Sequence, residues 1–143
     1  MPIWNVRATA VLAACLMLIP SISFAEDPVT EGCQSEIADA SVCGCAAKRL
    51  GRFLGTENFK RYAAFFNIYV KRHAEQIARG GETLSAWNGA MARYAKESGE
   101  DQFEVMGWVP DYQYAHRYAL KACGAAVPDA GLDKSLLFYG ESR

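Results

Sequence analysis

The sequence lacks the motifs that identify most enzyme classes. It contains two histidines and no Gly-x-Ser-x-Gly, His-Glu-x-x-His or glycine-rich phosphate-binding loop. Those patterns are typical of serine hydrolases, zinc proteases and nucleotide-binding enzymes. We therefore expect no catalytic residue, no cofactor and no enzymatic activity, and we expect the protein to act by binding.

Strand patterns and an excess of one charge are also missing. No useful stretch alternates between apolar and polar residues, and β-branched residues are sparse, so a β-sheet is not expected. The 15 basic and 16 acidic residues nearly balance, which argues against nucleic-acid binding. Because there is no repeat, low-complexity stretch or long linker either, we predict one domain over residues 26–143.

No hydrophobic run in the sequence is long enough to cross a membrane. The longest, residues 8–19, is shorter than the ~20 residues that a spanning helix needs. Arg7 precedes this run and small residues lead up to Ala25, a pattern typical of a secretory signal peptide. We predict that residues 1–25 are removed by cleavage after Ala25. The mature protein is then expected to be periplasmic or secreted, from a bacterium, and without a transmembrane anchor. A lipoprotein lipidated at Cys15 is the minor alternative.

Four stretches repeat apolar residues at helical spacing, and glycines after the stretches provide stops. The apolar stripe of the first includes Phe53 and that of the fourth includes Tyr118, so we expect both side chains to face the core. The pattern predicts an all-α fold, a small helical bundle or orthogonal array of about four helices. These helices run from a cap at Asp39 or Ser41 to about Leu54, from Glu57 to Arg79, from Leu84 to Ser98 with Thr83 as cap, and from Pro110 to Ala122.

Three other segments are less regular. Residues 26–40 are expected to form an extended or loosely helical arm that Cys33 ties down. Residues 100–109 are ambiguous, since Gly107 interrupts a short apolar pattern. Residues 132–139 are expected to form a short helical turn that docks on the core.

The cysteines predict two disulfides. Apart from Cys15 in the leader, the chain has Cys33, Cys43, Cys45 and Cys123, and thiols in an exported chain usually pair. Residues two apart on a helix are rotated by ~200°, so Cys43 and Cys45 should take different partners. Because Cys43 and Cys123 lie on apolar stripes, we favour Cys43–Cys123 with Cys33–Cys45. If the first helix begins after Cys45, Cys33–Cys43 with Cys45–Cys123 is equally good.

Two chemical roles compete with this structural one. Four cysteines could hold copper or zinc as thiolates, and Cys43-Gly44-Cys45 could form a strained, redox-active disulfide. Neither His73 nor His116 sits at an obvious ligand spacing from a cysteine, and we predict no metal site. His73 falls on a packed stripe and His116 at the edge of one, so no role is assigned to either.

Basic residues gather in the predicted first and second helices, between two acidic segments. They either complement those acidic segments within the domain or form a basic face for an anionic partner or lipid headgroups. The layout resembles small cysteine-stapled helical proteins of the bacterial envelope, such as acid-stress chaperones and immunity proteins, in architecture only. We expect a stress-related, chaperone-like or inhibitor-like module that binds another envelope protein. Its candidate basic surface is Lys48, Arg49, Arg52, Lys60, Arg61, Lys71 and Arg72.

Overall fold

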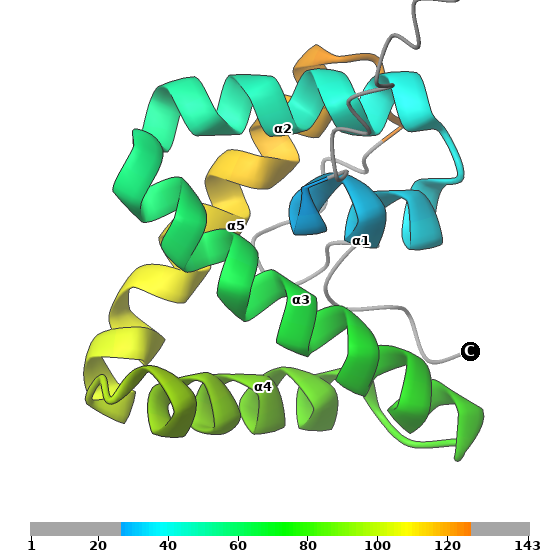
Figure 1. Cartoon of the computed structure of the whole chain (residues 1–143). Coiled ribbons are helices and arrows are strands. Elements are labelled where there is room, and N and C mark those ends of the chain that lie inside the picture. The colour runs from blue at the N-terminus through cyan, green and yellow to red at the C-terminus, as the bar shows by residue number, and fades with distance from the viewer. Residues whose placement is uncertain (1–26, 127–143) are drawn as a thin grey trace, which may run out of the picture.

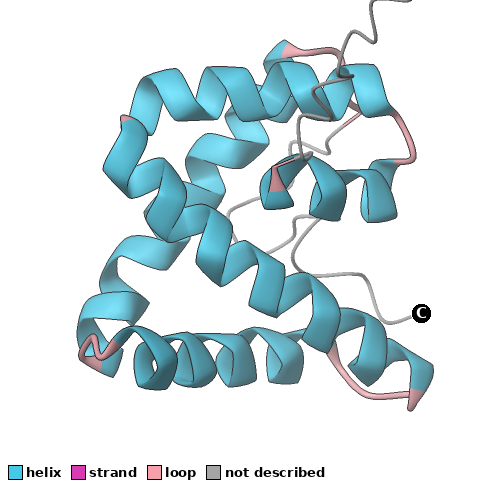
Figure 2. Cartoon of the chain, in the orientation of Figure 1, coloured by secondary structure: helices cyan, strands magenta, loops and turns pink. Residues whose placement is uncertain are grey.

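The computed structural model describes residues 27–126, and the all-α prediction is confirmed (Figure 2). Five helices occupy that range, joined by short turns, where about four were expected. The first of them replaces the predicted arm. The helices are α1 (Pro28–Ile37), α2 (Ala40–Leu54), α3 (Thr56–Ala78), α4 (Thr83–Ser98) and α5 (Gln102–Ala122).

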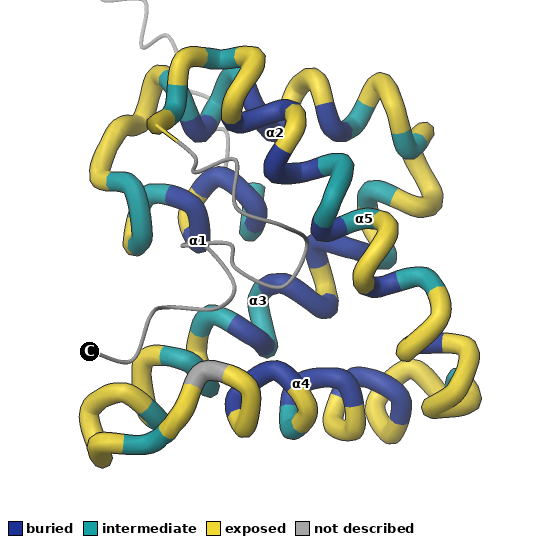
Figure 3. Tube along the Cα trace, turned by 180° about the vertical axis from the view of Figure 1, so that it is seen from behind, coloured by how far each residue is buried: buried dark blue, intermediate teal, exposed yellow. Residues whose placement is uncertain are grey.

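Helix α3 is the central element of the array. In Figure 1 it runs diagonally from the end of α2 to the start of α4, with α1 beside it and α5 crossing behind. Helix α3 packs against α1, α2 and α4, while α5 packs against α2 and α4. The result is an array of crossed helices whose buried sides point inward (Figure 3).

Aromatic rings from α3 form the centre of the core. One of them, Phe65, meets rings from α4 and α5 edge-on, with its centroid 5.1 Å from that of Trp87 and 6.1 Å from that of Trp108. Edge-to-face contacts of this kind stabilise aromatic pairs beyond their buried area. They join α3 to both of the helices that follow it. The four fully buried rings of α3 are those of Tyr62, Phe65, Phe66 and Tyr69.

Helix α1 forms because its start is strongly capped. The carboxylate of Asp27 accepts hydrogen bonds from the backbone N–H groups of Val29 and Thr30, both at 3.0 Å. Pro28 occupies the first turn, where a missing N–H costs nothing. The helix ends at Ile37, and the next residue, Ala38, has a φ of 55° in the left-handed region. Residues 28–37 are therefore a regular helix that packs against α2 and α3.

Helix α5 is longer than the stretch predicted from Pro110 to Ala122. It begins at Gln102, where the Asp101 carboxylate accepts a hydrogen bond from the N–H of Phe103 at 2.8 Å. The ambiguous segment 100–109 thus belongs mostly to this helix, and Pro110 lies inside it. Proline removes one hydrogen bond to the preceding turn. Pro110 is exposed, so water can replace that bond.

The remaining helix boundaries agree with the sequence to within one or two residues. Asp39 caps α2 as expected, accepting from the N–H of Val42 at 3.0 Å. Helix α4 begins at Thr83 itself, with Glu82 in the capping position. Helix α3 ends at Ala78, one residue before the predicted end.

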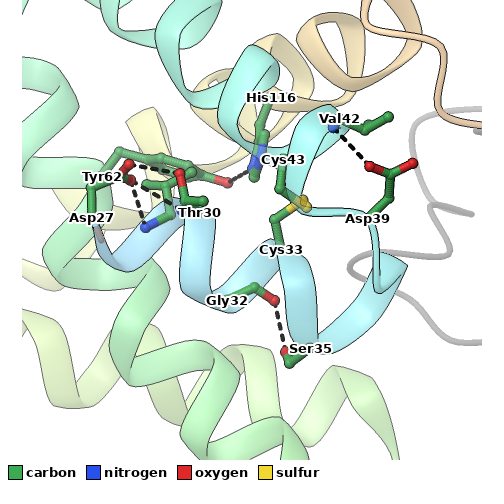
Figure 4. Close-up of a disulfide and its surroundings, with 11 residues drawn as sticks. Asp27, Thr30, Gly32, Cys33, Ser35, Asp39, Val42, Cys43, Tyr62 and His116 are labelled. Atoms are coloured by element: carbon green, nitrogen blue, oxygen red, sulfur yellow. Dashed lines mark hydrogen bonds between the residues drawn. A yellow bond between two sulfur atoms is a disulfide. The ribbon is translucent and has the colours of Figure 1, made fainter. Parts of the chain in front are cut away.

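The favoured disulfide pairing is wrong. The structure joins Cys33 to Cys43 and Cys45 to Cys123, with Cα separations of 5.6 and 5.9 Å. Helix α1 packs on the buried side of α2, which puts Cys33 beside Cys43 inside the core (Figure 4). Cys45 points the other way and meets Cys123 just after α5. Cys43 and Cys45 therefore take different partners, as expected. On sequence grounds the observed pairing goes with a helix that begins after Cys45, but α2 begins at Ala40, before both cysteines.

Some sequence predictions fall outside the described residues. These are the signal peptide over residues 1–25, lipidation of Cys15 and the short helical turn over residues 132–139. Within residues 27–126, no helix combines the length and the apolar character that crossing a membrane requires. The two disulfides are consistent with an oxidising compartment outside the cytoplasm.

The close approach of α1 and α3 at Gly32 gives a stability prediction. A Cβ on Gly32 would come within 2.6 Å of Phe66 Cε1 and 2.8 Å of Val70 Cγ2. Because the core has no room for it, Gly32→Ala should lower the free energy of unfolding by about 1–3 kcal/mol in urea titrations. A Cβ on Gly44 would meet no atom of the described residues within 4 Å, so Gly44→Ala is the matched control. It should raise stability by about 0.5–1 kcal/mol, and equal effects of the two changes would contradict the packing argument.

Candidate functional site

Three of the seven predicted basic residues come together on α2. Lys48, Arg49 and Arg52 are exposed and line a polar hollow along the outer face of the helix, together with Ser41 and Cys45. Within residues 27–126, no carboxylate lies at ion-pair distance from any of the three cations. They are therefore available to an anionic group from outside the domain.

The other four basic residues lie on α3 and do not extend this hollow. Lys60 pairs with Glu57 on the solvent side at 3.3 Å. Lys71 is exposed, while the guanidinium of Arg72 lies against α4 where Gly89 leaves space, since a Cβ there would be 2.9 Å from Arg72 Nε. The predicted surface of seven residues thus reduces to a cluster of three.

Arg61 is engaged within the domain. Its guanidinium forms an ion pair with Glu100, which also accepts hydrogen bonds from Tyr94 Oη at 2.8 Å and Trp108 Nε1 at 3.3 Å. The Arg61 guanidinium also stacks over the Trp108 ring at 4.5 Å. Hydrogen bonding by Arg61 lowers the pKa of the Glu100 carboxyl below its usual value. This cluster ties α3 to the turn between α4 and α5, so Arg61 complements an acidic segment of its own chain.

An apolar groove lies between α2 and α5, next to the basic cluster. Its volume is about 740 Å³. Phe53 on α2 is 78% exposed and Tyr118 on α5 is 60% exposed, although both were expected in the core. Three alanines of α5 are part of its lining. The groove is lined by Arg49, Leu50, Arg52, Phe53, Asp111, Tyr114, Ala115, Tyr118, Ala119 and Ala122.

Charges of opposite sign border the groove. Arg49 and Arg52 line it from α2, and they also line the adjoining polar hollow. Asp111 lines it from α5. The groove therefore offers an apolar surface with a basic wall and one acidic position opposite, which is the arrangement that an amphipathic segment can recognise.

The two histidines are held inside the domain and away from this groove. His116 is fully buried, and its Nδ1 lies 3.0 Å from the hydroxyl of Tyr62 (Figure 4). Burial lowers the pKa of His116 to about 3, against a small opposing effect of the Asp27 charge. His73 stacks on Tyr69, and its Nδ1 lies 3.0 Å from Glu36 Oε1. Both residues connect helices.

With both disulfides formed, the four cysteines offer no thiolate to a metal ion. All four form disulfides, so the hypotheses of copper or zinc binding through thiolates and of a Cys43–Cys45 disulfide have no free sulfur to use. Across residues 27–126, no three His, Cys, Asp or Glu side chains are grouped so that they could hold a metal ion. The groove is thus the candidate site that the geometry favours.

The buried histidine gives a pH prediction. An unfolded His116 binds a proton below about pH 6.5, while the folded protein excludes that proton down to about pH 3. The stability that neutral His116 confers is therefore complete above pH 6.5 and is lost as the pH falls toward the folded pKa. We expect the free energy of unfolding to drop by about 2 kcal/mol between about pH 7.5 and pH 5 through this residue.

Urea titrations across that range will measure this drop. The variant His116→Gln cannot take up the proton, so its stability, although lower overall, should depend less on pH by about that amount. If the variant and the parent lose equal stability on acidification, the buried histidine is not the cause.

Comparison with known proteins shows no matching family, no matching curated protein and no matching solved structure. The candidate site therefore rests on geometry alone. It consists of the apolar groove between α2 and α5 and the basic cluster of Lys48, Arg49 and Arg52 beside it.

Proposed function

We propose that this protein is an exported binding module of the bacterial cell envelope. Its groove between α2 and α5 would bind an apolar segment flanked by acidic residues in another envelope protein. The observation that carries this proposal is the open apolar groove with two arginines on its wall that form no ion pair within residues 27–126. Export is supported by the predicted leader over residues 1–25 and by two disulfides, which persist in oxidising compartments.

Exposed aromatic area provides the driving force for binding. Covering the exposed parts of Phe53 and Tyr118 would contribute about 3 kcal/mol each before the costs of association. Association itself costs several kcal/mol, so these two side chains supply only part of the binding free energy. The rest of the apolar lining and the charges on its wall would have to supply the remainder.

The charges around the groove select the partner. Arg49 and Arg52 favour carboxylates along the α2 side, and without a partner carboxylate they stay solvated. Asp111 on the α5 side disfavours an acidic residue there and accepts a basic one. The expected partner is an amphipathic helix or extended segment with one predominantly acidic edge.

Two synthetic amphipathic peptides test this proposal. They share one apolar face, and one carries acidic and the other basic flanking residues. Isothermal titration should give an affinity about tenfold higher for the acidic peptide. The double variant Phe53→Ala/Tyr118→Ala should weaken acidic-peptide binding by about tenfold or more, because it removes the two aromatic anchors. The double variant Arg49→Glu/Arg52→Glu should remove the preference for acidic flanks.

Matched controls separate the groove from general surface effects. Phe103 is 81% exposed and does not line the groove, so Phe103→Ala should leave binding unchanged. Lys60 is an exposed cation outside the groove, so Lys60→Glu should also have no effect. Equal binding of both peptides, insensitivity to the groove variants, or binding of anionic lipid vesicles in place of the acidic peptide would refute the proposal.

A further inference from the structure

The two disulfides differ sharply in accessibility. Cys33 and Cys43 are fully buried in the core, so a reagent reaches their sulfurs only when the helices separate. Cys45 and Cys123 are half-buried, and Cys45 lines the polar hollow on the outer face of α2. Just after Cys123, no atom of residues 27–126 would lie within 4 Å of a Cβ on Gly124. An external thiol can therefore approach the second bridge in the folded protein.

The more accessible bridge is also the one with cations beside it. Positions three and four residues apart on a helix share a face. Lys48 and Arg49 therefore stand on the face of Cys45, and all three line the same hollow. The corresponding neighbours of Cys43 are Ala46 and Ala47, which are buried. Nearby cations stabilise a thiolate, whereas an apolar core does not, so Cys45 is better placed than Cys43 to leave as an anion.

We infer that the Cys45–Cys123 bridge is a thiol–disulfide exchange site whose substrate is an external dithiol reductant. One thiolate of the reductant attacks Cys123 Sγ, forming a mixed disulfide and breaking the Cys45–Cys123 bond. The bond's electron pair leaves with Cys45 Sγ, and the resulting thiolate is held by Lys48 and Arg49. Exchange is faster when the leaving thiolate is stabilised, which favours Cys45 as the leaving group and Cys123 as the atom attacked.

The second step completes the electron balance. The second thiol of the reductant loses its proton. The thiolate then attacks the reductant's other sulfur, which is bonded to Cys123 in the mixed disulfide. Cys123 leaves as a thiolate and takes up a proton. The reductant is thereby oxidised to its disulfide by two electrons, and the protein gains two thiols while Cys33–Cys43 stays closed. This exchange does not depend on what the groove binds.

Differential labelling of the folded, oxidised protein tests the site. The protein is treated with dithiothreitol without denaturant, quenched, alkylated with one reagent, then unfolded, fully reduced and alkylated with a second. Peptide mass spectrometry should show the first label on Cys45 and Cys123 at a rate about 100-fold or more above that on Cys33 and Cys43. Equal rates, or earlier labelling of the buried pair, would overturn the inference.

Two further measurements test the direction of attack and the role of the cations. Trapping with glutathione, a monothiol, should place the mixed disulfide on Cys123, and a mixed disulfide on Cys45 would refute the proposed direction. The double variant Lys48→Gln/Arg49→Gln should slow reduction about fivefold, because the leaving thiolate loses its cations. Lys60→Gln, which removes a cation outside the hollow, is the control and should reduce at the parent rate. Equal rates in the double variant would show that exposure alone governs the reaction.

Discussion

The rotation of α2 between Cys43 and Cys45 determines how the domain is held together. Because the two side chains leave opposite sides of one helix, one sulfur reaches inward to α1 and the other reaches the end of α5. Helix α2 therefore carries a covalent link on each side. The first link lies in the core, and the second closes the array at the border of the α2–α5 groove. Both the candidate binding site and the proposed exchange site follow from this arrangement.

Sequence patterns could predict most of the helices, since apolar spacing and glycine stops are local properties. They could also predict that Cys43 and Cys45 take different partners. They could not predict which side of α2 the first segment packs against, and the disulfide pairing depended on that. A local indication was present, because Asp27 and Pro28 form a strong helix start with Glu31 in the first turn. Reading them together would have predicted α1 in place of an arm.

The candidate site was harder to predict than the fold. Phe53 and Tyr118 lie on apolar stripes, and a stripe does not tell how much of its width a neighbouring helix covers. Likewise, the positions of the charged residues along the sequence do not show which cations are paired. Arg61 is bound to Glu100, whereas Arg49 forms no ion pair within residues 27–126. Long-range pairing of this kind is fixed by how the helices cross, so only the assembled structure separates structural cations from available ones.

The two bridges also determine how the domain would respond to mechanical tension. The shortest covalent path between the ends of the described chain enters α1, crosses the first bridge, passes through Gly44 and crosses the second bridge. Helices α3, α4 and α5 lie outside that path. A pull on both ends would therefore load only a few residues, and the aromatic core would bear no force. Opening the second bridge would transfer the whole load to that core, so the reduced protein should be mechanically much weaker than the oxidised one.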